Sequence, residues 1–237
     1  GSLLVDGDLN WTGGSLSHSQ GVINVTGDWL QTTGSYTGSG RLDIDGDIDI
    51  SGSGTAFNAP SDTLVLAGNL QIDENATFSH NGGTIVVDGN TNSVWNKQGL
   101  DTLALNNLIL SFGQPRNMFP SQDLLIEGDL VLSANSTLNL SNNSCNLEIR
   151  GNITYNGTND AITEGNGTVN FNGNGVQEFN STSASESFYN LIVSADSGQV
   201  QLGTNVDIIN NLSLDSGSSS KLVLGNSNLS ISNNGSI

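Results

Sequence analysis

The sequence has little positive charge and almost no cysteine. Its 237 residues carry only five Lys and Arg against 23 Asp and Glu, which gives a formal net charge of -18. Such a chain repels phosphate backbones and anionic lipid surfaces, so we expect no nucleic-acid binding and no docking to an anionic membrane. Cys145 is the single cysteine, which excludes an intrachain disulfide and a zinc site built on cysteines.

Long apolar runs and helical patterns are missing as well. No stretch approaches the ~18 consecutive apolar residues of a membrane-spanning helix, so we expect no direct membrane insertion. No window repeats apolar residues at helical spacing over three turns, and Ala, Lys and Arg are scarce, which argues against long helices. Gly1 and Ser2 resemble a cloning scar, and the pattern runs unbroken to Ile237, so we expect a fragment of a longer protein.

What the sequence does contain is a short recurring phrase. An apolar residue is followed by any residue, then Gly or Asn, then Asp or Asn, and then apolar residues alternating with polar ones. The clear copies occupy residues 5–9, 25–29, 44–48, 66–70, 126–130 and 149–153. Weaker copies lie between and after them, at about 17 to 23 residues from one to the next. This period is typical of one rung of a β-solenoid and is too short for a propeller blade.

The phrase predicts an all-β fold, a single right-handed parallel β-helix of about 11–12 rungs of roughly 20–21 residues. Alternation such as Leu42-Asp43-Ile44 is typical of a strand with one buried and one exposed face. A flat antiparallel sheet could show the same alternation, but its hairpins would not require a constant phrase in every rung. No linker-like composition interrupts the chain, so we expect one continuous domain over residues 3–237.

A longer repeat lies on top of the short one. Residues 83–90 recur as residues 167–174, and the similarity extends over about 82–149 and 166–231. We interpret this as the duplication of a block of four rungs. Residues 112–120 break the pattern and hold two of the three prolines, which predicts an interrupting loop and a candidate interaction segment.

The polar residue of the turn predicts a structural ladder along the solenoid. Equivalent positions of successive rungs lie above one another, so Asn amides could stack and Asp carboxylates could accept hydrogen bonds from turn amides. Glycine before it would supply the positive φ of a sharp bend. The predicted turn ladder consists of Asp8, Asp28, Asp47, Asn69, Asn90, Asp129, Asn152 and Asn174.

Residues 167–177, 188–193 and 203–214 together resemble the β-helical repeats of very large surface proteins of Bacteroidota that are exported by the type IX route. The resemblance covers most of residues 82–237, although Val87 and Trp95 depart from it in the first copy. Residues 3–81 fit only the simpler phrase, which is similar to filamentous-haemagglutinin-type repeats. This resemblance implies a secreted, extracellular segment of a bacterial cell-surface adhesin, stalk or filament. It implies no catalytic residues.

The densest acidic run is a candidate calcium site. Asp43, Asp45, Asp47 and Asp49 alternate with apolar residues, so we expect their carboxylates on one outer face. Calcium takes six to eight oxygen ligands, but the EF-hand spacing and the nine-residue repeat of calcium-binding rolls are missing. The competing interpretation is a solvated acidic face, and no other cofactor is expected.

A surface for glycans is the other candidate site. Trp95 is the best candidate for an exposed tryptophan, with packing in the core as the competing interpretation, and Arg116 and Phe119 lie in the predicted loop. An aromatic ring on the surface could stack on a sugar. The three hypotheses for function are therefore a structural or adhesive stalk, a carbohydrate-binding module, and a polysaccharide-active β-helix enzyme.

Of these, the stalk is the expected function, and we do not expect an enzyme. Five scattered cationic residues make the clustered Asp and Lys or Arg of a polysaccharide lyase hard to assemble. Partners would be glycans or other cell-surface molecules. We expect a monomer as a fragment, with end-to-end or side-by-side packing of rods as an alternative because each end of a solenoid has unpaired strand edges.

Overall fold

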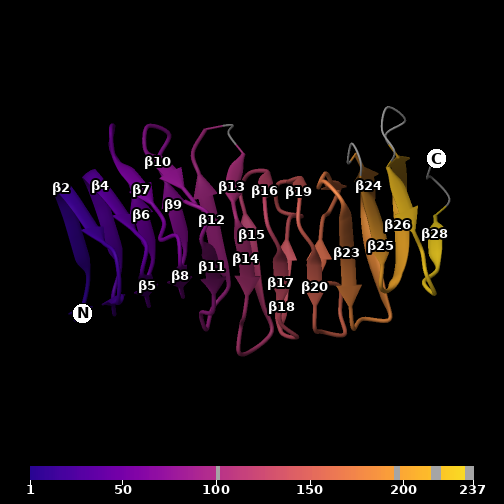
Figure 1. The fold of residues 1–237 in the computed structure, drawn as a ribbon, viewed down its shortest axis with the longest axis horizontal. Coiled ribbons are helices and arrows are strands. Elements are labelled where there is room, and N and C mark those ends of the chain that lie inside the picture. Colours follow the sequence, from indigo (N-terminus) through magenta and orange to yellow (C-terminus); the bar gives the residue numbers. More distant parts are fainter. Residues whose placement is uncertain (100–101, 195–197, 215–219, 233–237) are drawn as a thin grey trace.

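The chain folds into an all-β solenoid, described here from a computed structural model (Figure 1). The structure describes residues 1–99, 102–194, 198–214 and 220–232. Within these ranges there are 28 strands and no helix, and the strands pair in parallel. The solenoid has about ten turns of about 22 residues, so the turns are fewer and longer than the sequence predicted. Figure 1 shows the turns stacked along one axis, with the termini at opposite ends.

Sheet A, with 11 strands, extends along the whole solenoid and forms its first face. Its order is β1 (Leu3–Val5), β3 (Val22–Val25), β5 (Arg41–Ile44), β8 (Thr63–Leu66), β11 (Thr84–Val87), β14 (Asn107–Leu110), β17 (Leu130–Leu132), β20 (Ile153–Tyr155), β23 (Val176–Ser181), β25 (Gln199–Leu202) and β27 (Lys221–Val223). Each turn of the chain adds one strand to this sheet.

Sheet B, with 10 strands, forms the second face. Its order is β10 (Thr77–Ser79), β7 (Ala56–Asn58), β4 (Trp29–Gly38), β6 (Ile48–Ile50), β9 (Leu70–Ile72), β12 (Ser93–Lys97), β15 (Arg116–Pro120), β18 (Ser136–Asn139) and β21 (Ile162–Thr163), with β2 (Leu9–His18) paired to β4. The long strand β4 pairs with β6 through its first half and with β7 through its second half, so sheet B branches there.

Sheet C, with seven strands, forms the third face from the middle of the chain onward. Its order is β13 (Leu103–Leu105), β16 (Leu124–Ile126), β19 (Leu147–Ile149), β22 (Thr168–Phe171), β24 (Ser185–Val193), β26 (Asn205–Leu214) and β28 (Leu229–Ile231). From β11 to β22, successive strands visit sheets A, B and C in turn, and from β23 onward the described strands alternate between sheets A and C.

The core consists of apolar side chains stacked in files, one residue from each turn. In sheet A the backbone register places the members of one file directly above one another. The file contains Leu42, Leu64, Ile85, Leu108, Leu130 and Ile153, all of them buried. Burial of apolar area is the main stabilising contribution to such a fold, and the alternating strand pattern in the sequence follows from it.

The two copies of the longer sequence repeat do not occupy equivalent positions in the solenoid. Residues 83–90 contain β11 of sheet A, whereas residues 167–174 contain β22 of sheet C. Turns also differ in length, because Ile23 pairs with Leu42 near the start of the chain, whereas Ile153 pairs with the more distant Phe179 further along. The start of the second copy therefore lies on a different face from the start of the first, although the ends of both copies, residues 147–149 and 229–231, lie in sheet C.

The expected loop at residues 112–120 is largely wrong. Phe112 is buried, and residues 116–120 form β15, which pairs with β12 and β18 inside sheet B. The two prolines fit because Pro115 precedes the strand and Pro120 is its last residue, positions at which a missing N–H costs little. Only residues 113–115 remain as an exposed bend.

Candidate functional site

The acidic run does not form one ligand set. Asp43 lies on β5 of sheet A, where the Arg41 guanidinium lies 2.7 Å from its carboxylate, while Asp49 lies on β6 of sheet B. Burial, with the negative charge of Asp73, raises the pKa of Asp49. In the described part of the chain, no group of three or more His, Cys, Asp or Glu could hold a metal ion. The expectation that four carboxylates share one outer face is therefore wrong, because the turn at Asp45 separates two sheets.

Trp95 is not exposed, so core packing is the correct one of its two interpretations. Its side chain is 0% exposed and packs between Leu70 and Pro120 of the adjacent turns, and its Nε1 donates a hydrogen bond to Ser93 Oγ at 2.9 Å. The exposed residue of the pair is its neighbour Val94. A ring enclosed in the core cannot stack on a sugar, so this part of the glycan prediction is wrong.

Arg116 and Phe119 lie on β15 and are half-buried. The Arg116 guanidinium donates hydrogen bonds to two backbone carbonyls, those of Asn90 at 2.9 Å and Pro115 at 2.8 Å. Phe119 pairs in register with Val94 on the neighbouring strand β12. These contacts give Arg116 a role in holding the bend at residues 113–115, and Trp95, Arg116 and Phe119 do not come together as one site.

Polar side chains form three columns along the turns. In each column a side-chain oxygen accepts a hydrogen bond from the backbone N–H of the residue one turn later, at 2.7–3.0 Å. The first column contains Asp8, Asp28, Asp47 and Asn69, the second contains Asn107, Asp129 and Asn152, and the third contains Asp123 and Asn146. The columns connect successive turns in addition to the strand hydrogen bonds.

The sequence prediction of the ladder needs two corrections. Asn90 and Asn174 are exposed and lie outside the columns. The corner that follows β11 is longer than the corner that follows β8, so the position above Asn69 belongs to Val94. Three further members of the columns were not predicted. Asn107 was missed because no glycine precedes it. Asp123 and Asn146 were missed because they lie at a different corner of the solenoid.

At most of these turns glycine is required by the close approach of adjacent turns, whereas Gly7, with a φ of +108°, adopts the positive φ that the sequence predicted. Gly46 has an ordinary φ, but a Cβ atom there would overlap with Asp28 Oδ1 and lie 2.6 Å from the carbonyl carbon of Gly27. The column therefore requires glycine because the turns approach one another closely at this point.

Removal of one column oxygen should destabilise the solenoid measurably. In Asp129→Ala the backbone N–H and the side-chain amide of Asn152 lose their acceptor, and we expect the free energy of unfolding to fall by about 1–2 kcal/mol. Asp129→Asn keeps an acceptor oxygen and should change it by less than about 0.5 kcal/mol. Urea unfolding followed by circular dichroism measures both, and equal losses in the two variants would contradict the role of the column.

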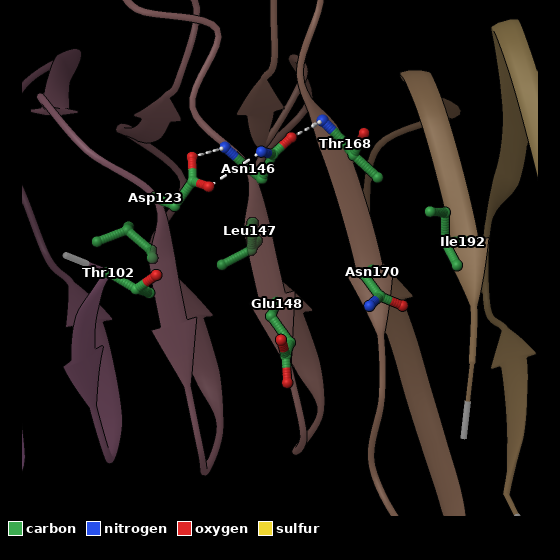
Figure 2. A pocket seen from close by; sticks show the side chains of 9 residues that line it. Thr102, Asp123, Asn146, Leu147, Glu148, Thr168, Asn170 and Ile192 are labelled. Carbon is green, nitrogen blue, oxygen red and sulfur yellow. Dashed lines mark hydrogen bonds between the residues drawn. The ribbon is translucent and has the colours of Figure 1, made fainter. Parts of the chain in front are cut away.

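A groove lies on the outer face of sheet C (Figure 2). Its volume is about 300 Å³, and β16, β19, β22 and β24 contribute to it. The residues that line the groove include Asp123, Asn146, Glu148, Thr168, Asn170 and Ile192. Figure 2 shows the third column along one border of the groove, with the side chains of Glu148 and Asn170 beyond it.

Strand register brings Glu148 and Asn170 together. Both alternate with buried residues on their strands and so face outward, and they are direct partners across β19 and β22. The next partner in the same row is Ile192 of β24. Neighbouring strands are about 4.8 Å apart, so these side chains lie side by side in the groove.

A second notable feature is a pair of buried carboxylic acids beside β21. Glu186 is 1% exposed and accepts hydrogen bonds from Ala161 N at 2.8 Å and Ser181 Oγ at 2.7 Å. Glu164 is 5% exposed, and its Oε1 atom has no hydrogen-bond partner among the described residues. Burial, with the nearby charges of Asp160 and Glu186, raises the pKa of Glu164 to about 8.

The described residues contain no helix that is long and apolar enough to cross a membrane. No protein-family model matches the chain, and no curated protein and no solved structure matches it.

Proposed function

We propose that the chain is a structural and adhesive rod, a stalk segment of a large secreted protein of the bacterial cell surface. The observation that carries the proposal is the uninterrupted axial stack. Sheet A continues through 11 strands, and the polar columns add hydrogen bonds between turns outside the core. At about 4.8 Å per turn, about ten turns give a rod of roughly 50 Å.

The charge of the chain supports an extracellular spacer. A net charge of -18 keeps neighbouring rods apart in solution and favours the monomer, and it disfavours nucleic acid as a partner. The parallel stacking also supports a mechanical role. Each turn contacts only its neighbours, so a rod under tension can unfold one turn at a time while the remaining turns stay folded.

Force spectroscopy tests the proposal. The chain is tethered by its two ends in series with an ordinary globular domain, which serves as the internal reference. We expect stepwise unfolding, with each 22-residue turn releasing about 75 Å of chain. Loss of the entire solenoid in a single step, at a lower force than the reference domain, would contradict a stalk.

A further inference from the structure

We propose that the groove on sheet C binds a neutral saccharide through two adjacent hydroxyls, with Glu148 as the acceptor and Asn170 as the donor. The inference deepens the adhesive half of the proposed function and rests on it, whereas the mechanical half is tested separately. The groove, at about 300 Å³, has the size of a small ligand site.

Neighbouring side chains fix the Glu148 carboxylate and leave one of its oxygens available to a ligand. Its Oε1 accepts hydrogen bonds from Arg150 Nη2 at 3.3 Å and from Asn172 Nδ2 at 3.0 Å. These partners fix the carboxylate and leave Oε2 free to accept further hydrogen bonds, because an ionised carboxylate has about four acceptor positions. The side chain is 34% exposed, so a ligand in the groove can reach it.

A hydrogen bond fixes the Asn170 side chain and leaves its amide NH2 group available to donate to a ligand. Its Oδ1 accepts a hydrogen bond from Ser194 Oγ at 2.8 Å, which sets the orientation of the amide. The Nδ2 group then points back toward Glu148, as Figure 2 shows. An acceptor and a donor therefore stand side by side on adjacent strands. Each sugar hydroxyl both donates and accepts, so two neighbouring hydroxyls of one ring match this pair.

Apolar side chains flank the polar pair. Leu125 precedes Glu148 in the same outward row, and Ile192 follows Asn170. A pyranose ring presents hydroxyls at its edge and C–H groups on its faces, so it can contact both kinds of side chain at once. Predominantly apolar walls with a few fixed polar groups are typical of ligand sites.

The charges of the groove select a neutral ligand. Both oxygens of Asp123 accept hydrogen bonds from Asn146, at 2.8 and 3.0 Å, so this carboxylate has a partner within the column. Arg150 is paired with Glu148 and with Glu127, at 3.3 and 3.7 Å. An anionic sugar would therefore meet carboxylates without a free cation among the groove residues, and a metal ion would find too few carboxylates, consistent with the lack of a metal-binding group in the described chain.

The test is binding to an array of immobilised polysaccharides. The array carries neutral glucans, mannans, galactans and xylans, together with polygalacturonate and heparin as acidic comparators. The full 237-residue chain is labelled at its N-terminus, and affinity for the best neutral polysaccharide is then measured by calorimetry in solution.

We expect binding to at least one neutral polysaccharide and to neither acidic one. Asn170→Ala should weaken binding roughly 5-fold, and Glu148→Gln roughly 10-fold because hydrogen bonds to charged groups are stronger. The matched control is Asn96→Ala, an outward-facing, half-buried asparagine of sheet B with one side-chain hydrogen bond, to Gln71. It should change binding less than 2-fold, and an unchanged thermal midpoint shows that each variant is folded.

Three results would overturn the proposal. These are no binding to any neutral polysaccharide, binding only to the acidic ones, or equal affinity in the wild type and both groove variants. None of these results bears on the stalk, because turn-by-turn unfolding under force is independent of the groove. Conversely, saccharide binding that depends on Glu148 and Asn170 would stand even if the rod unfolded in a single step.

Discussion

Replacement of Trp95 by alanine should lower the free energy of unfolding by about 3–5 kcal/mol. The indole is 0% exposed and is enclosed by Leu70 and Pro120 of the turns on either side. Truncation leaves a cavity in the middle of the solenoid, and adjacent turns cannot close over it because the strand hydrogen bonds fix their spacing. Urea unfolding followed by far-ultraviolet circular dichroism measures the loss.

Val94→Ala is the matched control for this prediction. Val94 is the preceding residue of the same strand, and its side chain is 46% exposed on the outer face. We expect a change of less than about 0.5 kcal/mol. If the two variants lost similar stability, or if Trp95→Ala lost less than about 1 kcal/mol, the inward orientation of Trp95 would be wrong.

The fold could be predicted from the sequence because its signal is local and repeated. Alternation such as Leu42-Asp43-Ile44 defines a half-buried strand, and the turn phrase recurs along the solenoid. Parallel stacking follows, since similar turns can bury a continuous core only on one another. The columns follow from the same logic, and Asp8, Asp28 and Asp47 lie in one of them.

The candidate site could not be predicted, because it depends on which residues of different turns are neighbours. Glu148 and Asn170 each look like an ordinary outward residue of a strand, and only the register places them side by side. The turns vary in length along the solenoid, so a fixed period in the sequence cannot give that register.

The error at Trp95 has the same origin. Val94 and Trp95 are adjacent apolar residues, and a strand places one inward and the other outward. The corner after Val87 is longer than those before it, and its length decides which of the two faces the core.

The stability of the solenoid should fall as the pH rises from about 4.5 to about 8, and Glu164 should be responsible for much of this fall. The folded pKa of Glu164 is raised to about 8, chiefly by burial, from an ordinary value of 4.5. Between these values the folded state keeps the proton that the unfolded state has released. The unfolded state therefore binds fewer protons, and each pH unit lowers the free energy of unfolding by up to about 1.4 kcal/mol.

Glu164→Gln should remove most of this dependence. Glutamine keeps the shape of the protonated side chain and cannot ionise, so the variant should be more stable than the wild type by a few kcal/mol at pH 8.5 and similar to it near pH 4.5. Urea unfolding at half-unit steps of pH gives both curves. The buried Glu186 and the solvent-exposed Asp160, whose pKa values desolvation also raises, remain in the variant and leave a smaller slope of the same sign.

Glu74→Gln provides the control, because Glu74 lies in an exposed turn. This variant makes the same Glu-to-Gln replacement without touching the buried site, so its curve should run parallel to that of the wild type. A Glu164→Gln curve that also stayed parallel would show that Glu164 is ionised in the folded protein at neutral pH. In that case a water molecule or a cation would have to satisfy its free oxygen, since the described protein atoms do not.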